Sequence, residues 1–96
     1  NISMLRKILC DFEFIYRGRI YKAFGFYLGD TTLPQQARTK DVTPLLVCKA
    51  FKISIEELGK MLKIHYWDID RNKLELAGFK FVKISLKFFP PLSKGD

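Results

Sequence analysis

Two helix-start signals that stand only eleven residues apart constrain this chain more than any other feature. Thr43 is a good N-cap residue, and Pro44 follows it at the first helical position, where a missing N–H costs nothing. Ser54 and Glu57 have the spacing of a capping box, in which each residue satisfies an orphan backbone N–H at the start of the next helix. Residues 43–63 are therefore predicted to form two short helices joined by a sharp turn.

The apolar spacing of this segment resembles that of the helix-turn-helix motif in DNA-binding proteins. The residues that carry the resemblance are Val47 and Phe51 on the inner face, the small Cys48 at the helix crossing, Ile53 in the turn, and Leu58 and Met61, which would pack the second helix onto the first. The motif usually has a left-handed glycine in its turn, whereas this chain has Lys52, which adopts that conformation at a modest cost. The resemblance covers about a fifth of the chain and implies DNA binding, but the core packing of any helical hairpin needs the same spacing.

The composition is that of one folded, basic domain. Its 96 residues suffice for a modest core, and a hydrophobic fraction of 48% with nine Phe excludes a disordered chain. Seventeen basic and ten acidic residues give a formal net charge of +7 and a pI near 9.6. Such a chain is attracted to phosphate backbones through a salt-dependent, sequence-blind interaction. Small basic proteins without a nucleic-acid partner also exist, so charge alone does not decide the function.

Signals for membranes, export and metal binding do not emerge from the sequence. No apolar run approaches the length of a membrane span, and no secretory signal pattern opens the chain. We therefore expect a cytoplasmic location and no membrane partner. Cys10 and Cys48 stand 38 residues apart in apolar surroundings, without the spacing of a metal site. They are predicted to be buried free thiols.

Residues 10–28 have the period-two alternation of a β-hairpin. The first strand would carry Cys10, Phe12, Phe14 and Tyr16 on one face and Asp11, Glu13, Ile15 and Arg17 on the other. Arg17-Gly18-Arg19 would supply the turn, because Gly18 can take a positive φ. The return strand would place on one face Ile20, Phe24, Phe26 and Leu28, with Lys22 interrupting them.

The rest of the chain is predicted to contain a loop, a polar turn and a final strand. Residues 29–41 have no apolar period and are predicted to be the loop, and residues 68–73 the polar turn. Residues 79–89 alternate strongly, with Val82, Ile84, Leu86 and Phe88 on one face and Lys83, Ser85 and Lys87 on the other. Residues 90–96 are predicted to be a loose tail.

These elements predict a single α+β domain over residues 1–96. A small antiparallel sheet would pack on the central helix pair, and the helices would cover one of its faces. The N-terminal hairpin would supply two strands, and the C-terminal segment would add one strand or a second hairpin from residues 66–88. A winged helix-turn-helix places a hairpin after its reading helix, where residues 66–88 lie, but the long N-terminal hairpin is not part of that plan.

No group of side chains has the pattern of a catalytic or cofactor site. His65 is the only histidine, and no partner for a proton relay stands at a recognisable spacing from it. Residues 68–70 begin like a calcium loop, but Lys73 stands in place of the invariant glycine and Phe79 in place of the bidentate glutamate. That segment is predicted to be a solvated turn in which an aspartate caps backbone donors. We expect no cofactor or metal, and an enzyme is the least supported class.

Basic residues form the candidate nucleic-acid-binding set. The set comprises Arg17, Arg19, Arg38, Lys40, Lys49, Lys52, Lys60, Lys63, Lys83 and Lys87. The leading hypothesis is a small non-enzymatic DNA-binding protein, a homodimer, whose second helix lies in the major groove of duplex DNA. Glu56, near the start of that helix, is unfavourable because an acid repels phosphate and can read only the amino group of cytosine.

Two alternative functions would use the sheet. Aromatic residues interleaved with basic ones can stack the bases of RNA or single-stranded DNA, although the same aromatics could simply fill the core of a small domain. Lysines on the outer face of the last strand can also serve only to guard a sheet edge. In the other alternative, the sheet pairs with a partner in a larger assembly, because 96 residues can hardly hide nine Phe and four Tyr.

Overall fold

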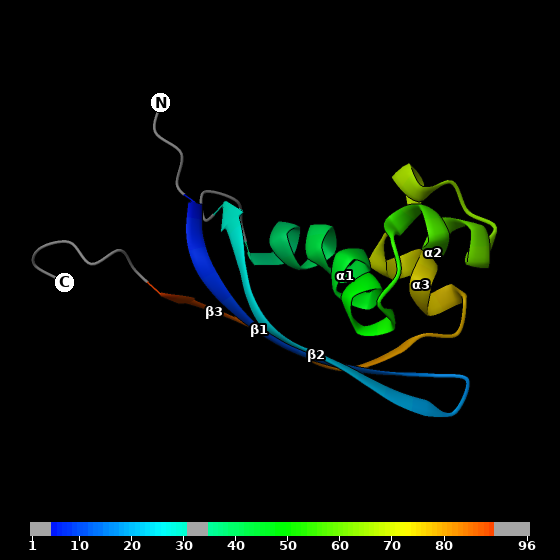
Figure 1. Ribbon diagram of the computed structural model, residues 1–96, viewed down its shortest axis with the longest axis horizontal. Helices are drawn as coiled ribbons and strands as arrows, with labels where there is room; N and C mark the ends of the chain where they lie inside the picture. The colour runs from blue at the N-terminus through cyan, green and yellow to red at the C-terminus, as the bar shows by residue number, and fades with distance from the viewer. Residues whose placement is uncertain (1–4, 31–34, 90–96) are drawn as a thin grey trace, which may run out of the picture.

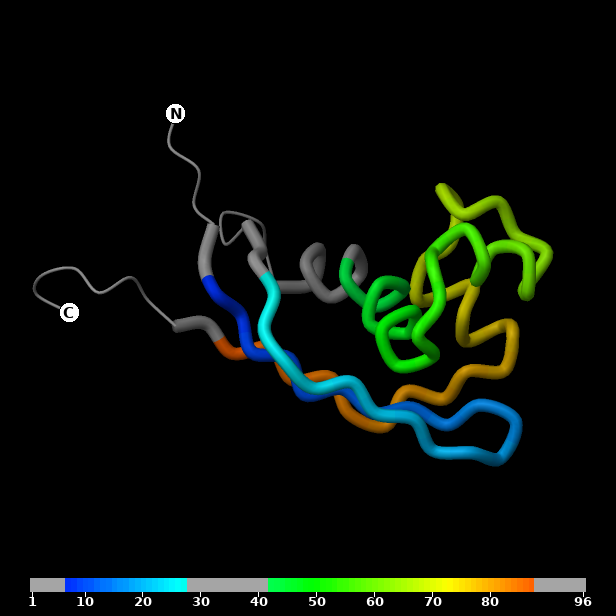
Figure 2. Tube along the Cα trace, in the orientation of Figure 1, coloured from blue at the N-terminus to red at the C-terminus, as the bar shows by residue number. Residues whose placement is uncertain are grey.

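In the computed structural model, the chain folds into a three-stranded antiparallel sheet with helices packed against one face (Figure 1, Figure 2). The structure describes residues 5–30 and 35–89, and the side chains of residues 7–27 and 42–87. The strand order is β2-β1-β3. The predicted α+β class, with its helices on one face of the sheet, is confirmed. The elements in chain order are β1 (Leu5–Tyr16), β2 (Arg19–Asp30), α1 (Gln35–Phe51), α2 (Ile55–Leu62), the 3-10 turn η1 (Tyr66–Asp68), α3 (Arg71–Leu76) and β3 (Lys80–Phe89).

The predicted N-terminal hairpin is present and longer than expected. The last paired residues of β1 and β2 are Tyr16 and Arg19, so the turn between the strands has two residues. Arg17 and Gly18 in that turn have φ of 52° and 77°. Both values are positive, as a type I′ turn requires, and this turn matches the right-handed twist of the two strands. Arg19 is therefore the first residue of β2 rather than part of the turn.

The C-terminal segment supplies one strand and not a hairpin. β3 confirms the strand predicted over residues 79–89, and it pairs with β1 on the side opposite to β2. The alternative hairpin over residues 66–88 is wrong, because η1 and α3 precede β3. The polar turn predicted over residues 68–73 is wrong in its second half. Residues 71–73 there belong to α3. The predicted capping by Asp68 or Asp70 is confirmed for Asp70, whose Oδ1 accepts from the backbone N–H of Lys73 at 2.9 Å at the start of α3.

A β-bulge changes the faces of β3. The register with β1 shifts between Glu13, which pairs with Lys83, and Phe14, which pairs with Phe81. Val82 is the extra residue and is 53% exposed, whereas Ile84 and Leu86 pack against the core, so the prediction that Val82 shares their face is wrong. Because of this extra residue, Phe81 before the bulge and Ile84 after it can both face the core although they are three residues apart. The side chain of Phe88 lies outside the described residues.

Aromatic side chains fill the space between the sheet and α1. The ring of Phe14, which is fully buried, lies 5.3 to 6.1 Å from the rings of Phe12, Tyr21, Phe51, Phe79 and Phe81. The aliphatic part of the core includes Ile8, Val42, Leu46, Val47, Leu58 and Leu74. The inner face predicted for the first strand is therefore confirmed, and Cys10 also lies on it.

Helix α1 begins earlier than the sequence predicts. The loop predicted over residues 29–41 is wrong at both of its ends, because β2 continues to Asp30 and α1 starts at Gln35, while residues 31–34 lie outside the described residues. Thr43 is consequently buried inside the helix and does not cap it, and Pro44 lies in the helix interior. An interior proline removes a hydrogen bond and costs about 3 kcal/mol. Burial around it offsets that cost, because the neighbouring core residues on α1 are Val42, Leu46 and Val47.

The predicted helix pair and its capping box are confirmed. The backbone N–H of Glu57 donates to Ser54 Oγ at 3.0 Å, and the backbone N–H of Ser54 donates to Glu57 Oε1 at 2.8 Å. Lys52 has a φ of 63°, so the turn is left-handed at the expected position without a glycine. Lys63, predicted to be the last helical residue, is instead the C-cap of α2, with a φ of 59°.

The packing of α2 differs from the prediction at one position. Leu58 is fully buried as predicted, whereas Met61 is 45% exposed. A Cβ added at Gly59 would lie 2.7 Å from the carbonyl oxygen of Ile64, so this glycine allows a close approach of the chain that follows the helix. The buried side of α2 therefore carries Leu58 and Gly59, and Met61 remains at the surface.

The left-handed lysine in the helix–helix turn yields a test of the fold. Replacing Lys52→Gly should raise the free energy of unfolding by about 1 kcal/mol, because glycine adopts this conformation without the Cβ clash. As a matched control, Lys60→Gly in the middle of α2 should lower it by about 1 kcal/mol. Urea unfolding measures both changes. Destabilisation by both variants would contradict a left-handed Lys52.

Candidate nucleic-acid interface

The helices cover one face of the sheet, and no element in the described part of the chain covers the other (Figure 1). The sheet bends around the helices, so the uncovered face is the convex one (Figure 2). We call this surface the open face. It comprises the register partners on the outer side of the strands: Lys7, Leu9, Asp11, Glu13, Ile15, Ile20, Lys22, Phe24, Phe26, Lys80, Lys83, Ser85 and Lys87.

Positive charge is concentrated on the sheet. Among residues 7–27 and 80–87, the strands and the hairpin turn carry two acidic residues, Asp11 and Glu13, and seven basic ones: Lys7, Arg17, Arg19, Lys22, Lys80, Lys83 and Lys87. The helical layer, residues 35–79, carries eight basic and six acidic residues over a longer stretch of chain and is nearly neutral. A polyanion is therefore attracted to the sheet far more than to the helices.

Two phenylalanines stand exposed on β2 among these lysines. Phe24 is 67% exposed and Phe26 is 50% exposed, and both project from the open face. Because they are two residues apart on one strand, their side chains are about 7 Å apart along it. Lys7 Nζ lies 5.2 Å from the centre of the Phe26 ring. This contact is a cation–π interaction of the kind that also accompanies base stacking.

Carboxylates occupy the middle of the open face and are paired with lysines. Lys83 Nζ donates to Asp11 Oδ2 at 2.6 Å, and this hydrogen bond raises the pKa of Lys83. Lys22 Nζ lies 4.0 Å from Glu13 Oε1. Both lysines remain well exposed, with side-chain exposures of 52% for Lys83 and 72% for Lys22. Lys83 therefore stays protonated at neutral pH, and both lysines can still contact a ligand.

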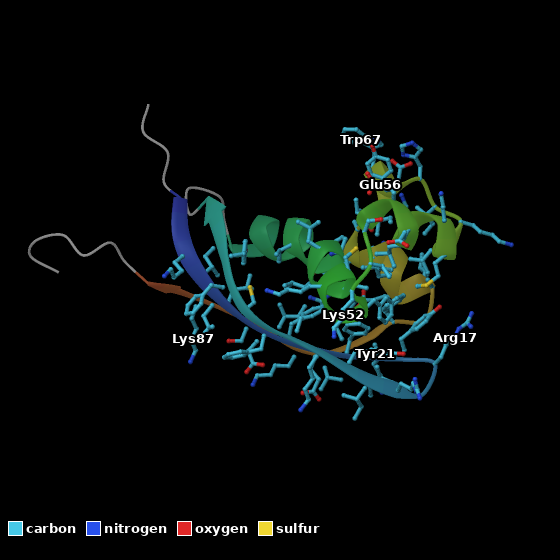
Figure 3. The ribbon with its side chains drawn as sticks, in the orientation of Figure 1. Arg17, Tyr21, Lys52, Glu56, Trp67 and Lys87 are labelled. Carbon is cyan, nitrogen blue, oxygen red and sulfur yellow. The ribbon has the colours of Figure 1, made fainter. Side chains whose placement is uncertain are left out.

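The hairpin tip extends this positive surface at one end. Arg17 and Arg19 are exposed there, and the Arg17 guanidinium lies 5.4 Å from the Tyr16 ring centre. Figure 3 shows Arg17 at the hairpin end and Lys87 toward the other end of the sheet, on the side away from the helices. The predicted residues Arg17, Arg19, Lys83 and Lys87 thus all lie on the three-stranded sheet and its hairpin turn.

The predicted residues of the helical layer do not join that surface. Lys49 points to the inner side of the sheet, where its Nζ would lie 3.0 Å from a Cβ added at Gly25. Lys52 is exposed in the helix–helix turn, and Lys60 and Lys63 are exposed along α2 and its end. The side chains of two further members of the predicted set, Arg38 and Lys40, lie outside the described residues.

The start of α2 is acidic, as the sequence indicates. Glu56 and Glu57 are both exposed, and the Ser54 hydrogen bonds lower the pKa of Glu57, so it stays ionised. Figure 3 shows Glu56 and Trp67 at the end of the helical layer that lies farthest from the sheet. A helix that enters the major groove uses its first residues, and here these would bring negative charge to DNA.

Sequence reasoning missed several members of the open face. Lys7, Lys22 and Lys80 were not selected, although all three are exposed there. The shared face of Ile20, Phe24 and Phe26 was predicted correctly, but not that it points away from the helices. The opposite face of β2 gives the signal, because its small Ala23 and Gly25 are suited to a strand over which a helix packs closely.

The described residues offer no evident catalytic or metal centre. No group of three or more possible metal ligands occurs among them. His65 Nδ1 accepts a hydrogen bond from the backbone N–H of Trp67 at 3.3 Å, so it caps η1 and has the predicted structural role. Among the same residues, no helix is both long and apolar enough to cross a bilayer.

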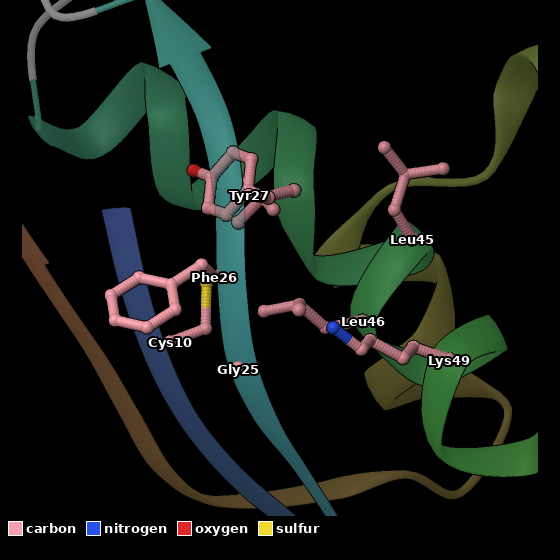
Figure 4. Close-up of a pocket in the computed structure, with 8 residues that line it drawn as sticks. Cys10, Gly25, Phe26, Tyr27, Leu45, Leu46 and Lys49 are labelled. Carbon is pink, nitrogen blue, oxygen red and sulfur yellow. The ribbon is translucent and has the colours of Figure 1, made fainter. Parts of the chain in front are cut away.

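A small cavity lies between β2 and α1 (Figure 4). Its volume is about 120 Å³, and its lining residues include Cys10, Gly25, Tyr27, Leu46 and Lys49. Burial raises the pKa of the Cys10 thiol more than Lys49 lowers it, so this thiol is protonated at neutral pH. A protonated, buried thiol is a poor nucleophile, and the cavity has no catalytic arrangement.

Known proteins do not assign a function to this fold. No family model matches the chain, and no curated protein or solved structure matches it either. Function is therefore inferred from the side chains of the molecule itself.

The second cysteine provides a test of how well the helix pair is packed. Cys48 is buried and free, as predicted, and burial with the nearby Glu56 and Glu57 raises its pKa to about 11. Since the thiol of the unfolded chain ionises at lower pH, the free energy of unfolding should fall as pH rises from 9 toward 11. The loss should be on the order of 2 kcal/mol relative to Cys48→Ala, measured by urea unfolding across that range. A difference between the two proteins that does not change with pH would contradict the buried thiol.

Proposed function

We propose that this protein binds single-stranded nucleic acid on the open face of its sheet. The observation that carries the proposal is the exposure of Phe24 and Phe26 on a face that also presents Lys7, Lys22 and Lys87. An exposed aromatic ring can stack with any base, and each stacked base contributes about 1–3 kcal/mol of binding free energy. The lysines around the rings would neutralise the phosphates.

Single strands fit this surface better than a duplex does. Their bases can splay outward and lie flat on rings that project from a sheet, whereas the bases of a duplex are stacked on one another. The major groove admits one helix or a two-stranded ribbon, and a third strand makes this face too broad for it. The nearly neutral helical layer and the acidic start of α2 provide little attraction for duplex phosphates.

A second candidate is a protein-interaction subunit that buries the open face. Ile20 on the same face adds exposed apolar area to the two phenylalanines, and monomeric proteins rarely leave large apolar patches uncovered. Lysines interleaved with these residues make a polyanion the better match, since a second copy would bring like charges together. Duplex binding through α2, with Lys60 and Lys63 on phosphates, is the remaining alternative.

Removal of both rings tests the proposal directly. The double variant Phe24→Ala with Phe26→Ala should weaken binding of a short uridine-rich RNA by about 30-fold or more, because it removes two stacking contacts. Fluorescence anisotropy with labelled RNA, single-stranded DNA and duplex DNA measures the affinities. Trp67→Ala, which removes a 76% exposed aromatic from the helical layer, is the matched control and should change affinity less than twofold.

The alternatives predict different results in the same assay. If Lys60→Glu with Lys63→Glu abolishes duplex binding while the phenylalanine variant binds every nucleic acid as the wild type does, α2 is the binding element and the proposal is overturned. Failure of every nucleic acid to bind at low salt would also overturn it. In that case, light scattering of the wild type and the phenylalanine variant would reveal a buried protein interface, and flotation with anionic vesicles would reveal a lipid surface.

The lysines of the open face predict a salt dependence. Lys80→Gln with Lys87→Gln should reduce the steepness of log K against log salt concentration by about 1.4, since each single-strand phosphate contact contributes about 0.7. Lys60→Gln with Lys63→Gln removes the same charge from α2 and should leave the slope unchanged. Equal effects of the two pairs would mean that only the overall charge of the protein matters.

A further inference from the structure

Polar groups beside the Phe24 ring form a specific pattern. Pairing across the strands places Phe24 of β2, Asp11 of β1 and Ser85 of β3 in one row across the open face. Lys83 belongs to the next row, yet its ammonium reaches back to the Asp11 carboxylate at 2.6 Å. An aromatic ring, an acceptor and a donor therefore stand side by side on exposed surface.

We propose that this group selects guanine in the bound strand, an inference that rests on the proposed single-strand binding. The base would stack on Phe24 and extend its Watson–Crick edge toward β1, where Asp11 and Lys83 lie. Guanine presents there two adjacent donors, its N1–H and 2-amino group, followed by the O6 acceptor. A carboxylate accepts both donors, and the neighbouring ammonium donates to O6.

The other bases do not match this arrangement. Adenine and cytosine each present one amino group beside a ring nitrogen that only accepts, so a carboxylate oxygen would face a lone pair. Uracil presents one N–H between two carbonyl oxygens, and the second carboxylate oxygen would again face an acceptor. Guanine is thus the base whose two adjacent donors satisfy Asp11 while its acceptor satisfies Lys83.

The geometry of the strands supports contact between the stacked base and this pair. Residues directly opposite on antiparallel strands have Cα atoms about 4.5–5.5 Å apart, so a base centred over Phe24 reaches the side chain of Asp11. The Asp11 side chain is 43% exposed, and its bond to Lys83 uses only part of its accepting capacity. Both groups are already held in place by their ion pair, which reduces the ordering cost of binding.

Single-base changes in the RNA test the inference. A short uridine-rich RNA with one central guanosine should bind about tenfold more tightly than the same strand with adenosine or cytidine there. Inosine, which lacks the 2-amino group, should give an intermediate affinity. Asp11→Asn should remove most of the preference, because the amide places a donor where the carboxylate accepts, so the ratio of the guanosine-strand affinity to the adenosine- and cytidine-strand affinities should fall toward one.

A second carboxylate on the same face is the matched control. Glu13→Gln removes the same charge, but Glu13 stands opposite Lys22 and not opposite a phenylalanine, so the guanine preference should persist. Equal affinities of the wild type for the guanosine, adenosine, cytidine and all-uridine strands, or an unchanged preference in Asp11→Asn, would overturn guanine selection and leave single-strand binding intact. Failure of every RNA and single-stranded DNA strand to bind would overturn both proposals.

Discussion

Burial of one sheet face around Phe14 is the constraint on which the rest of the structure depends. Six aromatic rings, including that of Phe14, meet between β1, β2, β3 and the end of α1. Since side chains alternate along a strand, every second residue lies on the opposite face of the sheet when the others pack in this cluster. On β2 the inner positions include Ala23 and Gly25, which leave room for α1, and the positions between and beside them are Phe24 and Phe26. Their exposure follows from the same packing that closes the core.

Local chemistry predicts those parts of the fold that local interactions control. The box formed by Ser54 and Glu57 sets the start of α2, and the two hydrogen bonds involve residues only three apart. The resemblance to a helix-turn-helix predicted a left-handed residue at Lys52, and its φ is 63°. The start of α1 was not predictable in this way. Its buried side must pack on the sheet to offset the cost of Pro44, and no pattern within residues 29–41 reports that contact.

The open face was only partly predictable for a similar reason. Alternation correctly placed Phe24 and Phe26 on one face of β2, and Lys83 and Lys87 on the polar face of β3. Which face of β2 meets the helices depends on its register with β1, a contact that period-two patterning does not specify. Lys80 shows most clearly what alternation cannot predict. Strict alternation along β3 would place it on the face of Val82 and Ile84, but the bulge at Val82 puts it on the open face with Lys83 and Lys87.

Chain topology explains why the sequence conceals the positive surface. The excess of basic residues is spread over both halves of the sequence, which suggests no patch. Because β3 returns to pair with β1, however, residues 7–22 and residues 80–87 meet in one sheet, while the nearly neutral segment between them forms the helical layer. A charge distribution that looks uniform along the chain thus becomes polarised between two layers. A polyanion approaching the molecule would be drawn to the layer that also carries the exposed aromatic rings.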